Sequence, residues 1–244
     1  MSFILLENHL EPLHQFLSQE DVSEISINRP QEIWVEQRGN MTRHELPQLT
    51  LRHLKDLAQL IATYSEQQIS AEHPLLSANL PQSYRVQIVY PPAVNDNTVG
   101  ISIRKPSLLD RDLAWHDEQG ALTPPDNSHQ LQIAKIKQQL IELHQKQQYK
   151  EFLHLAVTQR CNILISGGTS SGKTTFLNAL LKQVPQQERI ITIEDVPEIK
   201  LTQPNYLSLF ASRNQQGRAR IDMQQLVEAS LRLRPDRIII GELR

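Results

Sequence analysis

The residues best suited to chemistry stand together at positions 167–174, which read GGTSSGKT. They fit the pattern G-x-x-x-x-G-K-[ST], in which a glycine-rich backbone bends around phosphate oxygens, a lysine contacts the β- and γ-phosphates and a hydroxyl coordinates Mg²⁺. At an average glycine frequency of about 7%, the pattern arises by chance in roughly one chain of this length in a hundred. Three of the chain's eight glycines lie here. The pattern therefore predicts a nucleotide phosphate site, with a plain strand-to-helix turn as the alternative.

The sequence on either side of this stretch supports the same interpretation. A short apolar run at 162–166 precedes it, as expected of a strand buried on both faces. A helical pattern follows, and a helix beginning near Lys173 would direct its positive N-terminal dipole at the phosphates. The predicted cofactor-binding residues of the loop are Gly167, Gly168, Thr169, Ser170, Ser171, Gly172, Lys173, Thr174 and Thr175. Thr174 is the predicted Mg²⁺ ligand.

Acidic residues follow two further apolar runs, at 189–193 and 237–241. Glu194 and Glu198 come after the first run and Glu242 after the second. In parallel α/β sheets, ligands bind beyond the carboxyl ends of the strands, where a carboxylate can support Mg²⁺ or orient water. Each of these residues alone is more often a solvated strand end. Together with the phosphate pattern they are predicted to be catalytic.

Arginines are frequent between the two acidic stretches. They are Arg213, Arg218, Arg220, Arg232, Arg234 and Arg237. A solvated helix face and ion pairs account for most of them. One or two could instead neutralise a γ-phosphate, even across a subunit boundary, and the sequence does not select which.

Hydrophobic periodicity divides the chain into three parts. Residues 1–107 predict an α+β domain whose antiparallel sheet is covered on one face, with a first helix that Pro12 would kink or split. Residues 108–130 have the composition of a linker, and a helix is expected after it. Residues 131–244 alternate buried-strand runs with helical patterns, which specifies a parallel sheet. The predicted fold class is α/β, an N-terminal α+β domain joined to a partial nucleotide-binding domain.

The overall composition excludes several classes of protein. The 244 residues include 25 Lys and Arg and 27 Asp and Glu, a formal charge of −2, so general polyanion binding and specific nucleic-acid binding are not expected. The single cysteine, Cys161, rules out an intrachain disulfide framework. Neither a signal peptide nor an apolar run that could span a bilayer is evident, which predicts a cytoplasmic protein.

Three segments together resemble the secretion ATPase superfamily. ISGGTSSGKTT, ITIEDVPEIKL and LRLRPDRIIIGELR are similar to its Walker A, Asp-box and Walker B motifs, although Ser171 stands where the family often has glycine. Within the superfamily the chain most resembles the traffic ATPases of type IV secretion and conjugation, because EISINRPQEIWVEQRG, YRVQIVYPP and ISIRKPS also match. The resemblance covers nearly the whole chain except 108–150. The family continues well beyond GELR, so the resemblance implies a RecA-like domain truncated after Walker B.

The resemblance implies a homohexameric ring ATPase that uses ATP and Mg²⁺ and lies on the cytoplasmic face of the bacterial inner membrane. Other secretion-system ATPases and inner-membrane components would be its partners. Arg104, in ISIRKPS, matches an N-terminal-domain arginine that reaches the phosphates of the nucleotide, with a strand-end surface arginine as the alternative. The linker would act as a hinge between two domains that sandwich the nucleotide.

Other functions stay open from the sequence. A close alternative is a type II secretion or type IV pilus motor, against which the INRP and IRKPS segments speak. A nucleotide-responsive scaffold without turnover, or a truncated form that does not hydrolyse ATP, is the second. A small-molecule kinase also uses a phosphate loop, but the acidic box and the GELR segment disfavour it.

Overall fold

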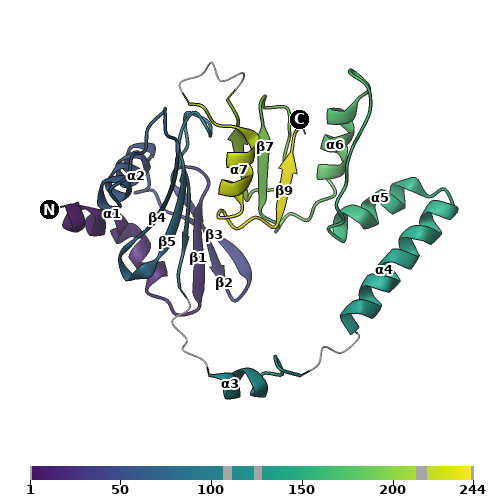
Figure 1. Cartoon of the computed structure of the whole chain (residues 1–244), viewed down its shortest axis with the longest axis horizontal. Coiled ribbons are helices and arrows are strands. Elements are labelled where there is room, and N and C mark those ends of the chain that lie inside the picture. The colour runs from purple at the N-terminus through teal and green to yellow at the C-terminus, as the bar shows by residue number, and fades with distance from the viewer. Residues whose placement is uncertain (1, 107–111, 124–127, 213–218, 243–244) are drawn as a thin grey trace. The chain divides into compact units, whose positions relative to one another are not determined.

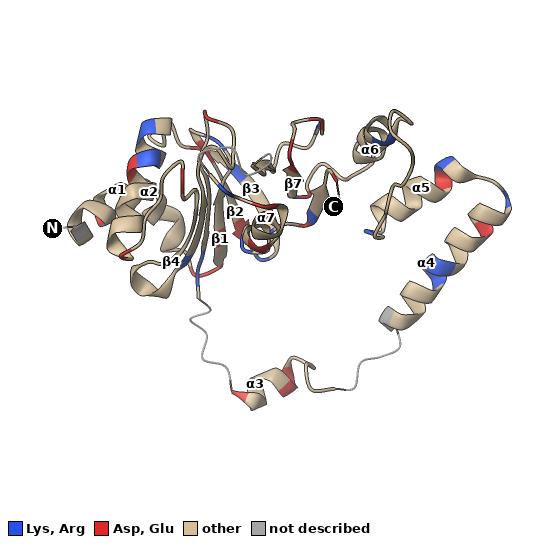
Figure 2. Cartoon of the chain, turned by 45° about the horizontal axis from the view of Figure 1, so that its top comes forward, with Lys and Arg blue, Asp and Glu red and all other residues tan. Residues whose placement is uncertain are grey.

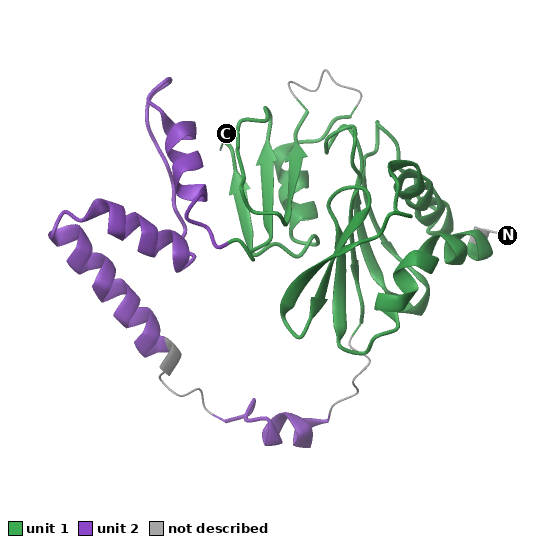
Figure 3. Cartoon of the chain, turned by 180° about the vertical axis from the view of Figure 1, so that it is seen from behind, with its two compact units in different colours: residues 1–106, 186–244 green, residues 107–185 purple. Residues whose placement is uncertain are grey.

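The computed structural model describes residues 2–106, 112–123, 128–212 and 219–242. The chain forms two compact units, one of residues 1–106 and 186–244 and the other of residues 107–185 (Figure 3). The sequence-based division placed the segment after 186 with residues 131–185, whereas this segment shares a hydrophobic core with the N-terminal part.

Six antiparallel strands form the larger sheet of the first unit, in the order β3-β2-β1-β6-β5-β4 (Figure 1). The strands are β1 (Val22–Ile27), β2 (Glu32–Gln37), β3 (Asn40–Glu45), β4 (Leu75–Asn79), β5 (Arg85–Val89) and β6 (Gly100–Arg104). A 3₁₀ turn, Pro81–Ser83, joins β4 to β5. The helices α1 (Ser2–Leu17) and α2 (Leu51–Tyr64) cover one face of this sheet (Figure 1). The predicted α+β arrangement is confirmed.

Apolar side chains on regular spacings hold the two helices against the sheet. Leu6 and Leu13 of α1 and Leu54 and Leu57 of α2 are fully buried. Pro12 does not split α1, which continues through it as one helix. The missing N–H of proline removes one backbone hydrogen bond, but the buried stripe stabilises the helix on both sides of that position.

The opposite face of the sheet carries polar side chains, and it is also buried. Ser26, Gln87 and Ser102 are each at most 3% exposed. The expectation that only one face is covered is therefore wrong. The segment after residue 186 covers the polar face, as the hydrogen bond from Arg189 to Asn28 and the ion pair of Arg234 with Glu36 require.

A second, parallel sheet of three strands has the order β8-β7-β9. Its elements are β7 (Ile190–Glu194), β8 (Tyr206–Phe210), β9 (Arg237–Ile240) and the helix α7 (Met223–Ser230). The predicted strands at 189–193 and 237–241 and their parallel direction are confirmed. The two sheets approach closely at Gly100, where a Cβ atom would lie 2.5 Å from a Leu207 methyl. Glycine at this position therefore permits the contact.

The second unit is helical over most of its described residues. Its helices are α3 (Leu113–Glu118), α4 (Ser128–Gln145), α5 (Tyr149–Thr158) and α6 (Lys173–Leu181). The helix expected after residue 130 is confirmed by α4. The predicted linker is not uniformly irregular, because Asp112 caps α3 by accepting a hydrogen bond from the N–H of Trp115 at 2.8 Å.

The predicted buried strand at 162–166 is wrong. This segment has no strand pairing in the structure, and its Leu164 side chain is 77% exposed. A short apolar run becomes a strand only where a neighbouring strand pairs with its N–H and C=O groups. The apolar pattern alone does not specify that neighbour.

Candidate functional site

The loop at 167–172 leads directly into helix α6. Gly172 precedes the helix with φ +88°, a left-handed conformation that glycine adopts without steric cost. The N–H of Phe176 donates to the carbonyl of Gly172 at 2.9 Å and so forms the first turn. The predicted helix start near Lys173 is confirmed, and the helix N-terminus lies at the end of the glycine-rich loop as an anion site requires.

Lys173 folds back over this loop. Its Nζ donates to the carbonyl oxygens of Gly167 at 3.0 Å and Gly168 at 2.7 Å. The ammonium is thus held inside the curve of the loop, where it could exchange these carbonyls for phosphate oxygens. Gly168 has open space where a Cβ would stand, which leaves its backbone accessible to a ligand. These features fit a nucleotide phosphate chain.

The groups that could hold a divalent cation fit Mg²⁺ better than a protein-only metal site. Across the residues that the structure describes, His, Cys, Asp and Glu side chains form no group of three or more that could share a metal ion. Mg²⁺ commonly takes one or two protein ligands together with phosphate oxygens and water. Thr174, a half-buried residue on the first turn of α6, carries a hydroxyl of the kind that such a site uses.

The carboxyl ends of β7 and β9 bring two of the acidic stretches together. The N–H of Gly241 donates to the carbonyl of Ile193 at 2.8 Å, and a Cβ atom at position 241 would lie 3.4 Å from Cγ of Glu194. Glu242, the next residue, is exposed at the same edge. The structure therefore places Glu194 and Glu242 at neighbouring strand ends, as the parallel arrangement predicted.

Glu194 and Glu198 differ in their surroundings. Glu194 is 2% exposed, and its carboxylate accepts hydrogen bonds from Thr192 and from the N–H groups of Glu198 and Ile199. Glu198, four residues further along the chain, is exposed. The two predicted catalytic glutamates are thus linked to each other, the first inside the protein and the second at its surface.

Arg104 lies at the end of β6, directly opposite Arg85 of β5 and Glu24 of β1 in the strand register. Both arginines are exposed. Like charges in directly opposite positions repel, whereas Glu24, on the other side of Arg104, carries the opposite charge when ionised. Arg85 was not selected from the sequence. The available signal was its position in YRVQIVYPP, one strand away from Arg104.

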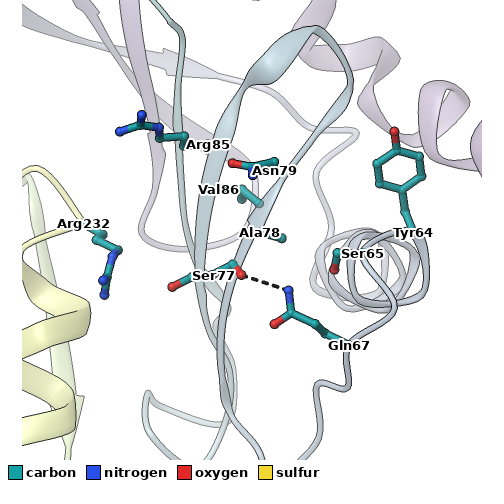
Figure 4. A pocket seen from close by; sticks show the side chains of 9 residues that line it. All are labelled: Tyr64, Ser65, Gln67, Ser77, Ala78, Asn79, Arg85, Val86 and Arg232. Atoms are coloured by element: carbon teal, nitrogen blue, oxygen red, sulfur yellow. Dashed lines mark hydrogen bonds between the residues drawn. The ribbon is translucent and has the colours of Figure 1, made fainter.

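Arg85 also lines a pocket of about 680 Å³ in the first unit. Figure 4 shows Arg85 and Arg232 on one side of the β4–β5 strands, with Tyr64 and Gln67 on the other. A hydrogen bond from the Gln67 amide to the Ser77 carbonyl, at 3.1 Å, connects α2's end to β4. The described lining contains two arginines and no carboxylate, so the pocket suits an anionic group.

The described arginines between residues 213 and 237 are either paired with a carboxylate or exposed. Arg234 pairs with Glu36, and Arg237 pairs with Glu188. These two act in the structure as predicted for most of the segment. Arg220 and Arg232 are exposed. Arg213 and Arg218 lie outside the described residues.

Burial also shifts the pKa values of charged residues on the polar face of the sheet. Arg189 is fully buried, and the loss of solvation lowers its pKa to about 10, partly opposed by Glu24. Burial raises the pKa of Glu24, against a hydrogen bond from Ser102. For Glu36, burial acts upward, but hydrogen bonds from Arg234 and Ser23 outweigh it and lower the pKa.

Comparison with known proteins decides the family. The sequence model of the family described as "Type II/IV secretion system protein" matches residues 121–244. The type IV secretion system protein VirB11 of Bartonella henselae (strain Houston 1) is 43% identical, over 96% of this chain and 69% of that protein. This chain belongs to the type IV secretion ATPase family.

Two other members agree with this assignment. The type IV secretion system protein PtlH of Bordetella pertussis is 39% identical, over 97% of this chain and 69% of that protein. The crystal structure of the VirB11 ATPase from the Brucella suis type IV secretion system, in complex with sulphate, superposes with a TM-score of 0.88. It is 34% identical and is matched over 100% of this chain and 70% of its own. The predicted family and fold class are confirmed.

The helices, the charged residues and the division into two units give further information about the chain. None of the helices in the described ranges combines the length and apolar character that crossing a bilayer requires. Basic and acidic residues are distributed over several elements of both units (Figure 2). Lys173 and Thr174 belong to the second unit, whereas Arg104 and the three glutamates belong to the first.

Proposed function

We propose that this member of the type IV secretion ATPase family binds ATP with Mg²⁺ and hydrolyses it to drive secretion or conjugation. The observation that carries the proposal is the loop at 167–172 leading into α6, with Lys173 held inside its curve. The sulphate in the Brucella VirB11 structure is a tetrahedral anion like phosphate, which supports the same ligand class.

Each residue has a defined part in this proposal. The loop N–H groups and Lys173 bind the phosphates, and Thr174 is the protein ligand of Mg²⁺, which lowers the cost of charge developing on the transferred phosphoryl group. Arg104, with Arg85 opposite it, adds positive charge to the phosphates. Glu242 and Glu198, exposed beyond the strand ends, orient or activate the attacking water.

The setting of the proposed activity follows from the family. We place the protein in a homohexameric ring on the cytoplasmic face of the bacterial inner membrane, next to other secretion-system ATPases and inner-membrane components. The relatives at 37–43% identity are type IV secretion proteins, so a type II secretion or pilus motor is not favoured. The chain covers 69% of the length of the Bartonella protein. ATP hydrolysis by these 244 residues is therefore itself part of the proposal.

Steady-state phosphate release tests the proposal. The unmodified chain should release phosphate from Mg-ATP, and Lys173→Ala and Glu242→Gln should each lower the rate by about 10²-fold or more, as expected for removing groups that act on the transition state. If the unmodified chain binds ATP but releases no more phosphate than Lys173→Ala, the chain is a nucleotide-responsive scaffold instead.

A further inference from the structure

The carboxylate of Glu194 acts as a bridge within the chain. Its Oε2 accepts the N–H groups of Glu198 and Ile199, each at 2.8 Å, and its Oε1 accepts the Thr192 hydroxyl at 3.0 Å. The residue is 2% exposed, and Thr192 is fully buried. Three donors thus converge on one carboxylate inside the protein.

The segment after β7 depends on this bridge for its path. Residues 195–199 form neither helix nor strand, so their N–H groups have no regular backbone ladder to join. Pro197 has no N–H, and the next two N–H groups both reach the same Glu194 oxygen. The main chain of Glu194 is itself fixed, since its carbonyl accepts the N–H of Ala211 at 2.8 Å. A side chain anchored in the sheet therefore determines where Glu198 lies.

The same geometry argues against Glu194 as the group that contacts water in the reaction. A carboxylate oxygen accepts about two hydrogen bonds, and the two N–H groups occupy Oε2. Oε1 is engaged with Thr192 within the protein. Glu198, in contrast, is exposed. A general base must come within hydrogen-bond reach of the proton it takes.

We propose that Glu194 is a positioning residue, which fixes the segment 195–199 and so holds the Glu198 carboxylate in place for the ATP reaction. This assignment rests on the proposed ATPase function. It replaces a catalytic role for Glu194 with an indirect one, exerted through two backbone N–H groups. Glu198 is then the exposed carboxylate of this segment, and Glu194 the buried one that holds the segment.

Glutamine at position 194 separates the two roles. A glutamine carbonyl oxygen can accept both N–H groups, and its NH₂ can donate to the Thr192 hydroxyl, because a hydroxyl also accepts. Glu194→Gln therefore keeps all three hydrogen bonds and removes only the charge. Glu194→Ala removes the bridge itself. A water-activating carboxylate would be lost in both variants.

The experiment compares Glu194→Gln, Glu194→Ala and Glu198→Gln with the unmodified chain, by steady-state phosphate release from Mg-ATP and by amide hydrogen exchange of residues 198 and 199. We expect Glu194→Gln to keep kcat within about 3-fold, and Glu194→Ala and Glu198→Gln to lower it by roughly 10²-fold, the scale for misplaced reacting groups. Exchange at 198 and 199 should accelerate by about 10-fold or more in Glu194→Ala only.

Two results would overturn the assignment. One is a Glu194→Gln variant as inactive as Glu194→Ala with exchange at 198 and 199 unchanged, which would make Glu194 a catalytic carboxylate. The other is unchanged exchange in Glu194→Ala, which would show that the bridge does not hold the segment. Hydrogen exchange needs no turnover, so it decides the bridge separately even if the unmodified chain fails to hydrolyse ATP.

Discussion

The guanidinium of Arg189 donates through Nη1 to Oδ1 of Asn28 at 2.7 Å, although the two residues are 161 positions apart in the chain. The same Nη1 donates to Asn205 at 2.6 Å, and Nε donates to the carbonyl of Leu233 at 2.8 Å. One fully buried side chain thus joins the end of β1 to the starts of β7 and β8. Because β7 carries Glu194 at its other end, this network ties the N-terminal sheet to the acidic edge.

Removing this side chain should destabilise the first unit. Arg189→Ala leaves the side-chain oxygen of Asn28 and the carbonyl of Leu233 without their buried donor, and it leaves Oδ1 of Asn205 with the Asn28 amide alone. The expected loss in the free energy of unfolding is about 3 kcal/mol. Urea denaturation followed by circular dichroism measures it.

A surface arginine provides the matched control. The side chain of Arg38 is 82% exposed and pairs with Asp21 at 3.3 Å. Exposed pairs contribute little, so Arg38→Ala should cost less than about 1 kcal/mol. Equal losses for the two variants would contradict the importance of the Arg189 network.

Two neighbouring glutamates should respond to pH in opposite directions. Glu24 and Glu36 lie opposite each other on β1 and β2. Burial raises the pKa of Glu24, so its charged form is disfavoured in the folded state and Glu24→Gln should cost no stability at pH 7. The pKa of Glu36 is lowered against the effect of burial by Arg234 and Ser23, so Glu36→Gln should destabilise the protein at pH 7 by about 2 kcal/mol.

The sign of each pH dependence follows by linkage. The stability from Glu36 is present above its unfolded pKa, near 4.5, and is lost as pH falls through the lower folded pKa. The effect of Glu36→Gln should therefore shrink below pH 4.5. Any gain in the free energy of unfolding from Glu24→Gln should begin to shrink at a higher pH than this. As pH falls through the raised pKa of Glu24, the wild-type carboxyl takes up a proton and its unfavourable charge is lost. Urea denaturation at pH 7, 5 and 4 checks both, and a Glu24→Gln variant that loses as much as Glu36→Gln at pH 7 would be inconsistent with them.

Local patterns predicted much of the fold. Leu54, Leu57 and Ile61 of α2 have the three- and four-residue spacing of one helix face, and all three side chains are fully buried. The acidic strand ends were predictable because parallel strands end at one edge. The run at 162–166 failed, because a strand needs a partner that no local pattern supplies. Strand β8 was missed despite its alternation of buried Leu207 and Leu209.

Long-range burial of charge was not predictable from the sequence. Arg189 stands before an apolar strand, where arginine usually marks a solvated strand end. Its burial depends on oxygens supplied by Asn28, Asn205 and Leu233, which are distant in the chain. Arg85 was missed for a related reason, since its place opposite Arg104 follows from strand register rather than from spacing.

The two opposed arginines should contribute to nucleotide affinity. Arg104→Ala and Arg85→Ala are each expected to weaken Mg-ATP binding by about 10-fold, the size of one hydrogen bond to a charged group. Fluorescence titration with a labelled ATP analogue measures the change. Arg52→Ala is the control, because that side chain is 92% exposed on α2. An Arg104 variant that binds like Arg52→Ala would remove Arg104 from the site.

Gly172, which adopts a left-handed conformation directly before α6, should affect nucleotide binding as well as stability. Alanine at position 172 would adopt φ +88° only with strain of about 1–2 kcal/mol. If the strain displaces the helix start, the affinity for Mg-ATP should fall by about 10-fold. Gly39 has φ +83° in the β2–β3 turn and similarly open surroundings, so Gly39→Ala carries the same strain away from the loop. Equal affinity in the two alanine variants would argue against a preformed loop.

Isothermal titration calorimetry of the folded chain with Mg-ATP, next to Lys173→Ala, tests the phosphate site most directly. Lys173 already lies within 3.0 Å of the Gly167 and Gly168 carbonyls, so its ammonium is in place for a phosphate. The unmodified chain should bind with a measurable heat, and Lys173→Ala should bind at least roughly 100-fold more weakly, as for the loss of a buried charge contact. An unmodified, folded chain with no binding heat at several temperatures, or with the same affinity as Lys173→Ala, would contradict nucleotide binding at this loop.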